Sequence, residues 1–311
     1  MNGFLNVLKP PGMTSHDVVA YLRRTLAIKK VGHLGTLDPG AAGVLPVALG
    51  FATRLAEHVP SEPKGYRAEL QFGLVSDSYD AFGAITETGS PECPDFSLLE
   101  SSLCSFRGII EQRPPMASSV RVQGRHLYEY YREGLAREAP LRKVKVSSLK
   151  IVSYSPPRLI IDVECGEGTY VRSLCHDIGQ TLGCGAILTF LVRWQSGIFR
   201  IENAMTPGEL AEGFQENRLG HFLVPPGQAL QHMPVVRLDE GDMLRVLKGA
   251  ALRLEKRHGP LPQGGERLRL ELPDGTLAAL GEVLLQGVPM LKPVKVFLEG
   301  RGDGDDKSTL R

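Results

Sequence analysis

The sequence predicts an α+β fold, because strand-like and helix-like patterns follow one another irregularly along its 311 residues. Residues 64–73 (KGYRAELQFG) show the period-two alternation of a half-buried strand, and residues 171–182 carry apolar side chains at helical spacing. Residues 234–298 combine one short helix pattern, EGDMLRVLKG, with short strands separated by Gly and Pro. We therefore expect one large domain and a small, β-barrel-like C-terminal domain.

The first elements along the chain are a strand and a helix. Residues 3–8 (GFLNVL) form a short apolar strand that stops at the turn sequence KPPG. Thr14 or Ser15 can then cap a helix, because apolar residues recur after them at helical spacing. These apolar residues are Val18, Val19, Leu22 and Leu26.

A second strand and helix occur together near the middle of the chain. Residues 159–165 (LIIDVEC) form an apolar strand that runs into GEGTYVRSLCHDIGQTLG, where Thr169 is the expected N-cap and Gly183 the helix end. The apolar stripe of this helix is Val171, Leu174, Ile178 and Leu182. Arg172 lies in the first turn, where a positive charge opposes the helix dipole unless an acid or a phosphate answers it. Arg172 is therefore a candidate functional residue.

The domain boundaries follow from composition. The proline-rich segment FLVPPGQALQHMP is expected to be a linker. We predict a large domain over residues 1–229 and a small domain over residues 230–299. Residues 300–311 contain a single apolar side chain and are expected to be disordered.

The composition, 42% hydrophobic and 23% charged, is that of an ordinary globular protein. Apolar runs stay shorter than a membrane span and the N-terminus lacks the layout of a signal peptide, so we expect a cytoplasmic protein. The five cysteines show no CxxC pair, which predicts buried free thiols and no structural metal. CGEGTYVRS opens a helix but lacks the third glycine of a dinucleotide fingerprint and the GK[ST] of a phosphate loop. No nucleotide cofactor is expected.

Charges are unevenly distributed although the formal net charge is only +1. Residues 1–34 hold five Lys and Arg against one Asp, and residues 105–150 hold ten against four Glu. Residues 76–100 hold six acids and no base. Such segregation fits either solvated surfaces or a basic face that meets a polyanion.

Asp38 is the only Asp, Glu, Lys or Arg between Val31 and Thr53. The sequence Asp-Pro-Gly favours a turn, which by itself explains an acid at this position. The neighbouring residues are mostly apolar, however, and an acid in apolar surroundings costs free energy unless it is paired. We therefore predict a cationic partner for Asp38.

The stretch GHLGTLDPGAAGVLPVALG resembles the signature block of the TruB-type pseudouridine synthases, bacterial enzymes that isomerise uridine 55 in the T loop of tRNA. Four further blocks resemble the family in family order, which extends the likeness over about residues 3–200. These blocks are LNVLKPPGMTSHDVV, KGYRAELQFG with SDSYDAFG, QRPPMASSVRVQGRHLYE and GEGTYVRSLCHDIG. The C-terminal region is more loosely similar to the small PUA-like domain of bacterial members. The implied fold is that of a pseudouridine synthase, with a mixed, mostly antiparallel central sheet flanked by helices.

The resemblance also implies roles for individual residues. Asp38 is implied as the catalytic nucleophile, Arg172 as its ion-pair partner and Tyr66 as a catalytic residue against the flipped uracil. The remaining implied substrate contacts are Tyr170 and Leu191, which would line the pocket, and His33, which would contact the opened T loop. The Lys and Arg residues of the two basic regions would meet phosphates, which predicts binding that weakens steeply with salt.

Five positions depart from the common family pattern. Leu34 and Ala42 stand where many members have Thr, Ala117 replaces a frequent Tyr, and Ser76 and Ser78 replace Thr. None of these departures removes a charged group implied in catalysis.

Three interpretations follow. The first is a monomeric tRNA pseudouridine-55 synthase that acts on the T arm without cofactor, obligatory protein partner or guide RNA. The second is a non-catalytic RNA-binding or tRNA-folding protein that uses the same basic surface. The third is an enzyme that works only within a larger RNA-dependent assembly, although the GVLPVALG continuation matches the stand-alone bacterial form better.

Overall fold

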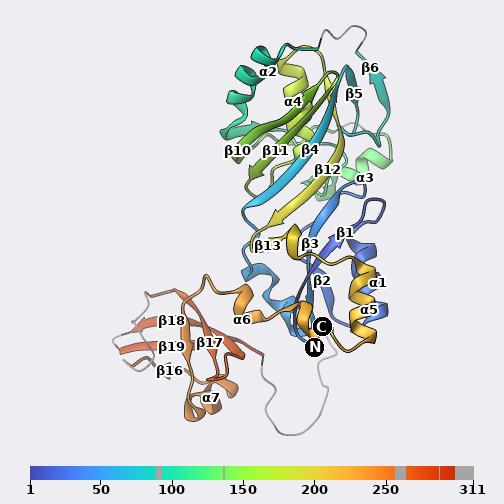
Figure 1. Ribbon diagram of the computed structural model, residues 1–311. Helices are drawn as coiled ribbons and strands as arrows, with labels where there is room; N and C mark the ends of the chain where they lie inside the picture. The colour runs from blue at the N-terminus through green and yellow to red at the C-terminus, as the bar shows by residue number, and fades with distance from the viewer. Residues whose placement is uncertain (89–92, 136, 256–263, 287, 298–311) are drawn as a thin grey trace. The chain divides into compact units, whose positions relative to one another are not determined.

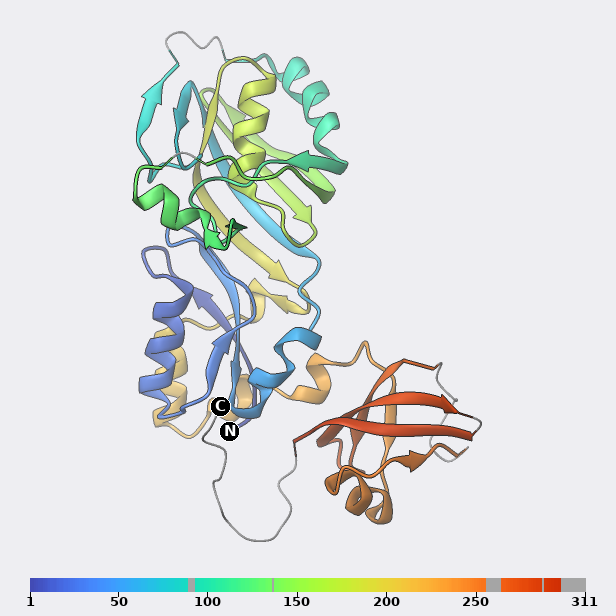
Figure 2. The same cartoon turned by 180° about the vertical axis from the view of Figure 1, so that it is seen from behind.

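The computed structural model describes residues 1–88, 93–135, 137–255, 264–286 and 288–297 (Figures 1 and 2). The chain forms two compact units. The large unit comprises Leu5–Gly50 and Pro60–Leu223. The small unit comprises Met1–Phe4, Phe51–Val59 and the chain from Val224 onward. The predicted boundary near residue 229 stays a prediction, and the expected disordered tail at 300–311 lies outside the described residues.

The main sheet is mixed and mostly antiparallel, as the family resemblance implies. Among the described residues it has the order β14-β1-β3-β12-β4-β11-β10-β7, while β13 pairs with β12 and β2 with β3. Strand β12 runs antiparallel to β4 and parallel to β3. The strands are β1 (Gly3–Lys9), β2 (Val31–His33), β3 (Ala42–Leu49), β4 (Lys64–Phe72), β7 (Gly108–Gln112), β10 (Arg142–Ser155), β11 (Arg158–Cys165), β12 (Ala186–Ser196), β13 (Phe199–Arg200) and β14 (Leu223–Val224).

Helices and small hairpins accompany this sheet. The α-helices are α1 (Ser15–Thr25), α2 (Phe96–Leu103), α3 (Leu127–Arg132), α4 (Val171–Thr181) and α5 (Pro207–Gln215). The 3-10 helices are η1 (Gly50–His58), η2 (Cys104–Phe106), η3 (Ile201–Asn203) and η4 (Leu219–Phe222). The hairpins are β5 (Leu74–Ser76) with β6 (Ile85–Glu87), and β8 (Arg121–Val122) with β9 (Arg125–His126). None of the described helices is long and apolar enough to cross a membrane.

Helix α4 packs on the sheet beside α2 (Figure 2). Its predicted apolar stripe is buried at Val171, Leu174 and Ile178. A Cβ at Gly179 would lie 2.2 Å from the backbone nitrogen of Ala186, so this glycine allows α4 to approach the start of β12 closely. The position of α4 matters because Arg172 lies in its first turn.

The two predicted helix caps have different outcomes. Thr14 caps α1, where its hydroxyl accepts from the Asp17 backbone nitrogen and the Asp17 carboxylate accepts from the Thr14 backbone nitrogen. The prediction that Thr169 caps α4 is wrong, because the N-cap residue is Tyr170. The Thr169 hydroxyl instead donates to the Gly166 carbonyl in the preceding turn.

The small unit contains a five-stranded sheet of order β15-β17-β18-β19-β16 with helix α7, and its curled sheet confirms the barrel-like prediction. Its elements are α6 (Pro226–Ala229), β15 (Val235–Arg237), α7 (Glu240–Leu247), β16 (Leu252–Arg253), β17 (Arg267–Glu271), β18 (Leu277–Gln286) and β19 (Val288–Val296). Strand β15 precedes the helix and was not expected. The predicted linker contains β14 and α6, with Gly227 and Ala229 buried, so it is not a simple connection.

All five cysteines are free thiols, as the spacing predicts. Cys165, Cys175 and Cys184 are buried. Cys104 is exposed, so the expectation of burial does not hold for it.

Candidate active site

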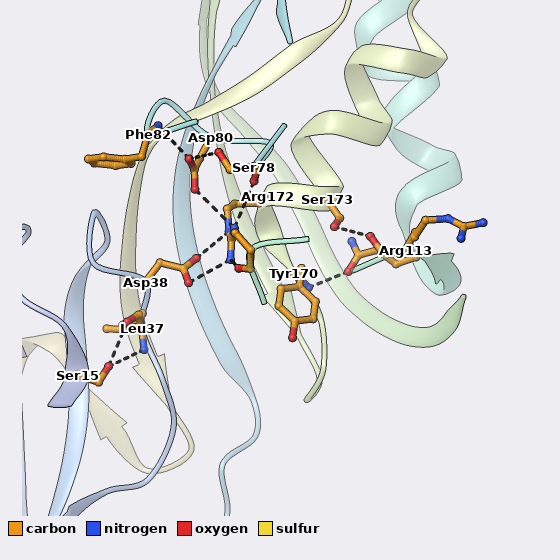
Figure 3. A network of polar contacts seen from close by, with 12 residues as sticks. Ser15, Leu37, Asp38, Ser78, Asp80, Phe82, Arg113, Tyr170, Arg172 and Ser173 are labelled. Carbon is orange, nitrogen blue, oxygen red and sulfur yellow. Dashed lines mark hydrogen bonds and ion pairs between the residues drawn. The ribbon is translucent and has the colours of Figure 1, made fainter. Parts of the chain in front are cut away.

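Asp38 lies in the connection between β2 and β3, at the start of the predicted turn. The Ala41 backbone nitrogen donates to the Asp38 carbonyl at 3.0 Å, which closes this turn. The preceding residue is fixed by Ser15, whose hydroxyl accepts from the Leu37 nitrogen at 2.9 Å and donates to the Leu37 carbonyl at 3.1 Å (Figure 3). The main chain on both sides of Asp38 is therefore held in place.

Lys9 supports the same turn from within the protein. Its ammonium donates to the carbonyls of Met13 at 2.6 Å, Pro10 at 2.9 Å and Pro39 at 3.2 Å. Lys9 is fully buried, and burial lowers its pKa to about 8. The prediction that Lys9 meets phosphate is therefore wrong, because main-chain carbonyls occupy all three donors.

Arg172 reaches Asp38 from the first turn of α4 (Figure 3). Its Nε lies 2.9 Å from Asp38 Oδ2, and its Nη2 donates to Asp38 Oδ1 at 3.2 Å. Its Nη2 also donates to the Ala117 carbonyl at 3.0 Å, and its Nη1 donates to the Ser78 carbonyl at 3.3 Å. The Arg172 side chain is 5% exposed and that of Asp38 is 40% exposed, so the cation is the buried partner.

Residues 112–117 hold the first turn of α4 in place through hydrogen bonds. The Gln112 side-chain oxygen accepts from the Tyr170 backbone nitrogen at 2.8 Å, and the Arg113 carbonyl accepts from the Ser173 hydroxyl at 2.7 Å. The Ala117 carbonyl accepts from Arg172. This contact uses the main chain, so Ala117 keeps it without the tyrosine that many family members have.

Asp80 is a second acid beside Arg172, and the sequence analysis did not single it out. Its Oδ2 lies 3.7 Å from Arg172 Nη1, and its Oδ1 accepts from the Ser78 hydroxyl at 2.7 Å and the Phe82 nitrogen at 2.9 Å. Asp80 belongs to the acid-rich stretch 76–100, which indicated only a charge run. The hydroxyl contact shows that Ser78 supplies the oxygen that a threonine would supply.

A pocket of about 370 Å³ opens beside the carboxylate of Asp38. Its charged groups are Asp38, Asp80 and Arg172, and most of its remaining wall is apolar. That wall consists of Pro39, Gly40, Ala41, Ser78, Phe82, Ala117, Tyr131, Leu188, Thr189, Phe190 and Leu191. The register of β12 against β4 shifts between Leu188 and Phe190, and this bulge brings four consecutive residues to the pocket.

Tyr66 and His33 lie near the pocket without lining it. Tyr66 is buried in β4 beside the guanidinium of Arg193, and burial raises the pKa of its phenol. Arg193 is almost completely buried, and its guanidinium donates to the carbonyls of Val44 at 2.8 Å and Thr36 at 3.3 Å. Burial, then the charge of Arg193, lowers the pKa of half-buried His33. The sequence analysis missed Arg193, although a single cation in a largely apolar strand is the same kind of signal as Asp38.

The other two predicted substrate contacts are placed differently. Leu191 lines the pocket, as its predicted role requires. Tyr170 is absent from the described pocket wall and packs against a small apolar cluster of Val120, Leu127 and Ala139. The structure thus brings Asp38, Arg172 and Leu191 together at one pocket, and Tyr170 lies outside the described lining.

The fold and this site place the chain among the pseudouridine synthases. Residues 23–171 match the model of the TruB family pseudouridylate synthase N-terminal domain, and residues 172–231 match the tRNA pseudouridylate synthase B C-terminal domain. The chain belongs to the TruB family of pseudouridylate synthases, as its motifs predict.

Relatives and solved structures agree with this assignment. The chain is 46% identical to tRNA pseudouridine synthase B of Heliobacterium mobile, over 92% of this chain and 91% of the relative. It is 45% identical to the protein of the same name from Moorella thermoacetica, over 95% and 99%. A chain in the crystal structure of a Cbf5-Nop10-Gar1 complex superimposes with a TM-score of 0.71 at 29% identity, covering 95% of this chain and 85% of that one.

Proposed function

We propose that this chain converts uridine 55 in the T loop of tRNA to pseudouridine, with Asp38 as the nucleophile. The observation that carries the proposal is the Asp38 carboxylate, which is 40% exposed toward an apolar pocket while a buried guanidinium fixes both of its oxygens. The names of the similar proteins, tRNA pseudouridine synthase B, support tRNA as the substrate.

The reaction is an isomerisation that needs no net oxidation. The bond from ribose C1′ to N1 breaks, the uracil turns, and C1′ joins C5; N1 gains a proton and C5 loses one. An ionised carboxylate suits this chemistry because it can attack C1′ of the ribose or C6 of the base without first losing a proton. The contacts from Arg172 orient the Asp38 carboxylate during the attack.

The target base must leave its stack to reach Asp38, at a cost of a few kcal/mol. The apolar wall around Leu191 offers a place for the flipped uracil. We propose that Tyr66 and Tyr170, which do not line the pocket in this structure, contact the substrate once RNA is bound, and that His33 contacts the opened T loop. Burial raises the pKa of Tyr66 further above neutrality, so its phenol is protonated at neutral pH.

The basic surface for the T arm excludes Lys9 but retains exposed cations in both basic regions. Arg23, Arg24, Lys29 and Lys30 are exposed, as are most Lys and Arg of residues 105–150. We propose that these side chains bind phosphates and that residues 230–299 act as a PUA-like RNA-binding domain. We further propose that the chain works in the cytoplasm as a monomer, without guide RNA or protein partner.

The test is turnover of an unmodified tRNA transcript by the purified chain alone. Uridine tritiated at C5 releases its label on isomerisation, and mapping of the product locates the modified position. We expect release at position 55 alone, with binding that weakens steeply between 50 and 200 mM salt in the manner of phosphate contacts. Binding without release would favour the non-catalytic RNA-binding alternative, and release only with added factors would favour an assembly.

Two variants assign the roles of the site. Asp38→Asn should abolish tritium release while RNA binding is retained, because the amide keeps its size but loses its nucleophilicity. Appreciable residual turnover would exclude Asp38 as the nucleophile. Tyr66→Phe should bind RNA normally and slow a step after binding, and normal turnover would remove the Tyr66 hydroxyl from the mechanism.

A further inference from the structure

Phe82 is a large apolar side chain in an unusual position, at the edge of the pocket that holds Asp38. It is 76% exposed although phenylalanine is usually buried, and it lines the pocket together with Asp38 and Arg172. Its ring extends away from Arg172 (Figure 3). An apolar ring exposed at the edge of a polar active site leaves an aromatic face available to a ligand.

The backbone of Phe82 is fixed by the same network that holds Arg172. The Phe82 nitrogen donates to Asp80 Oδ1 at 2.9 Å, and Asp80 faces Arg172. The Ala81 nitrogen donates to the Leu188 carbonyl at 3.0 Å, which ties this loop to β12. Because these hydrogen bonds already hold the backbone of Ala81 and Phe82, little conformational entropy is lost when the Phe82 ring contacts a ligand.

The turn that carries Asp38 leaves room for this ring. A Cβ at Gly40 would lie 2.0 Å from the Phe82 ring, so the glycine allows the ring to lie against the turn. Phe190 lies in the bulge of β12, is also exposed, and lines the same pocket. Two exposed phenylalanine rings from separate elements therefore border the pocket that contains the reacting carboxylate.

We propose that Phe82, assisted by Phe190, stacks on a nucleobase next to the flipped uridine. The proposal rests on the proposed function, because it requires an RNA whose target base enters the pocket. The neighbouring nucleotide is covalently attached to the target and must then lie at the pocket edge. Arg172 is the only cation among the described lining residues, and protein acceptors engage it, so this edge suits the face of a base better than a phosphate. Stacking on an aromatic ring tolerates any base.

The experiment uses T-arm hairpins in which 2-aminopurine replaces one nucleotide, either directly 5′ or directly 3′ of the target uridine. Stacking on Phe82 should quench the fluorescence of one of these probes when the full-length protein binds. Phe82→Ala should remove that quenching and raise the dissociation constant roughly 5- to 150-fold, the range that corresponds to base–aromatic stacking. Phe82→Trp should preserve both.

Phe96→Ala is the matched control, because Phe96 is similarly exposed on α2 and does not line the pocket. It should leave affinity and quenching unchanged. Unchanged quenching and affinity in Phe82→Ala would overturn the proposal, and so would a loss that Phe82→Trp fails to restore. Tritium release by the wild-type chain in the same assay tests the proposed function separately, so the two failures are distinguishable.

Discussion

The turn that carries Asp38 and the first turn of α4 supply the two partners of one ion pair, and they hold them in different ways. Around Asp38 the main chain is fixed by Ser15 and Lys9, while the carboxylate itself stays 40% exposed. At Arg172 the side chain is fixed, because its hydrogens meet Asp38 and two carbonyls in a site that is 5% exposed. The exposed partner can meet a substrate, and the buried partner depends on its neighbours for stability.

This contrast predicts unequal costs when each partner is removed. Arg172→Met should lower the free energy of unfolding by about 3 kcal/mol, because Asp80 and two carbonyls lose a buried cationic donor. Asp38→Asn should cost about 1 kcal/mol, because the amide oxygen still accepts from Arg172 and Asp80 still balances its charge. Urea denaturation at pH 7 measures both, and turnover should be lost in both.

Arg67→Met provides the control on an exposed pair of the same chemistry. Arg67 and Asp162 form an ion pair with a closest N–O distance of 2.8 Å across neighbouring strands, with the Arg67 side chain 55% exposed. Its loss should cost less than about 1 kcal/mol. Equal destabilisation by Asp38→Asn and Arg172→Met would show that the buried cation does not contribute more to stability than its exposed partner.

The main-chain support of Asp38 is tested at Ser15. Its side chain contacts the main chain next to Asp38 and no reacting group. Ser15→Ala removes both hydrogen bonds to Leu37 in a buried site and should lower stability by about 1 to 3 kcal/mol. Turnover at saturating RNA should also fall, because Asp38 follows directly, while RNA affinity is retained. Ser105→Ala, which removes an exposed local hydrogen bond, should alter neither. A stability loss with unchanged turnover would separate Ser15 from the placement of Asp38.

The sequence allowed prediction of the ion pair because each partner violates a local rule. Asp38 is a lone charge in an apolar stretch, and Arg172 is a cation at a helix start, so each predicts a partner of opposite charge. The family motifs then identified the two as one pair. Apolar patterns also predicted β1, β4 with Tyr66, β11 and the helices α1, α4 and α7, but not the long strands β3, β10 and β12.

The structural roles of Lys9, Asp80 and Thr169 could not be predicted from local sequence, since tertiary contacts determine their surroundings. A lysine before two prolines is typical of an exposed turn, yet the acceptor Pro39 comes from a different part of the chain. Asp80 resembled one member of an acidic run until α4 brought Arg172 beside it. Thr169 is a residue type that commonly caps a helix, but here the Gln112 side chain accepts a hydrogen bond from the Tyr170 nitrogen at the start of α4.

Asp177 is a second charged residue on α4, and its surroundings differ from those of Arg172. Arg172 is surrounded by acceptors, whereas Asp177 has no hydrogen-bond or ion-pair partner among the residues that the structure describes, and burial raises its pKa to about 6. The folded chain therefore binds more protons than the unfolded chain between about pH 4 and 6. Stability contributed by the protonated form is present below this window and is lost as pH rises through 6.

Asp177→Asn should consequently stabilise the protein at pH 7 by about 1 kcal/mol, less than the shift alone implies because the side chain is partly exposed. The advantage should disappear as pH falls to 4, which urea denaturation at both pH values can measure. Glu100→Gln on the exposed face of α2 should show no comparable gain. Asp177→Asn could instead be less stable than the wild-type protein at both pH values. The Asp177 carboxylate would then have to accept a contact that stabilises α4, as Arg172 does through its own contacts.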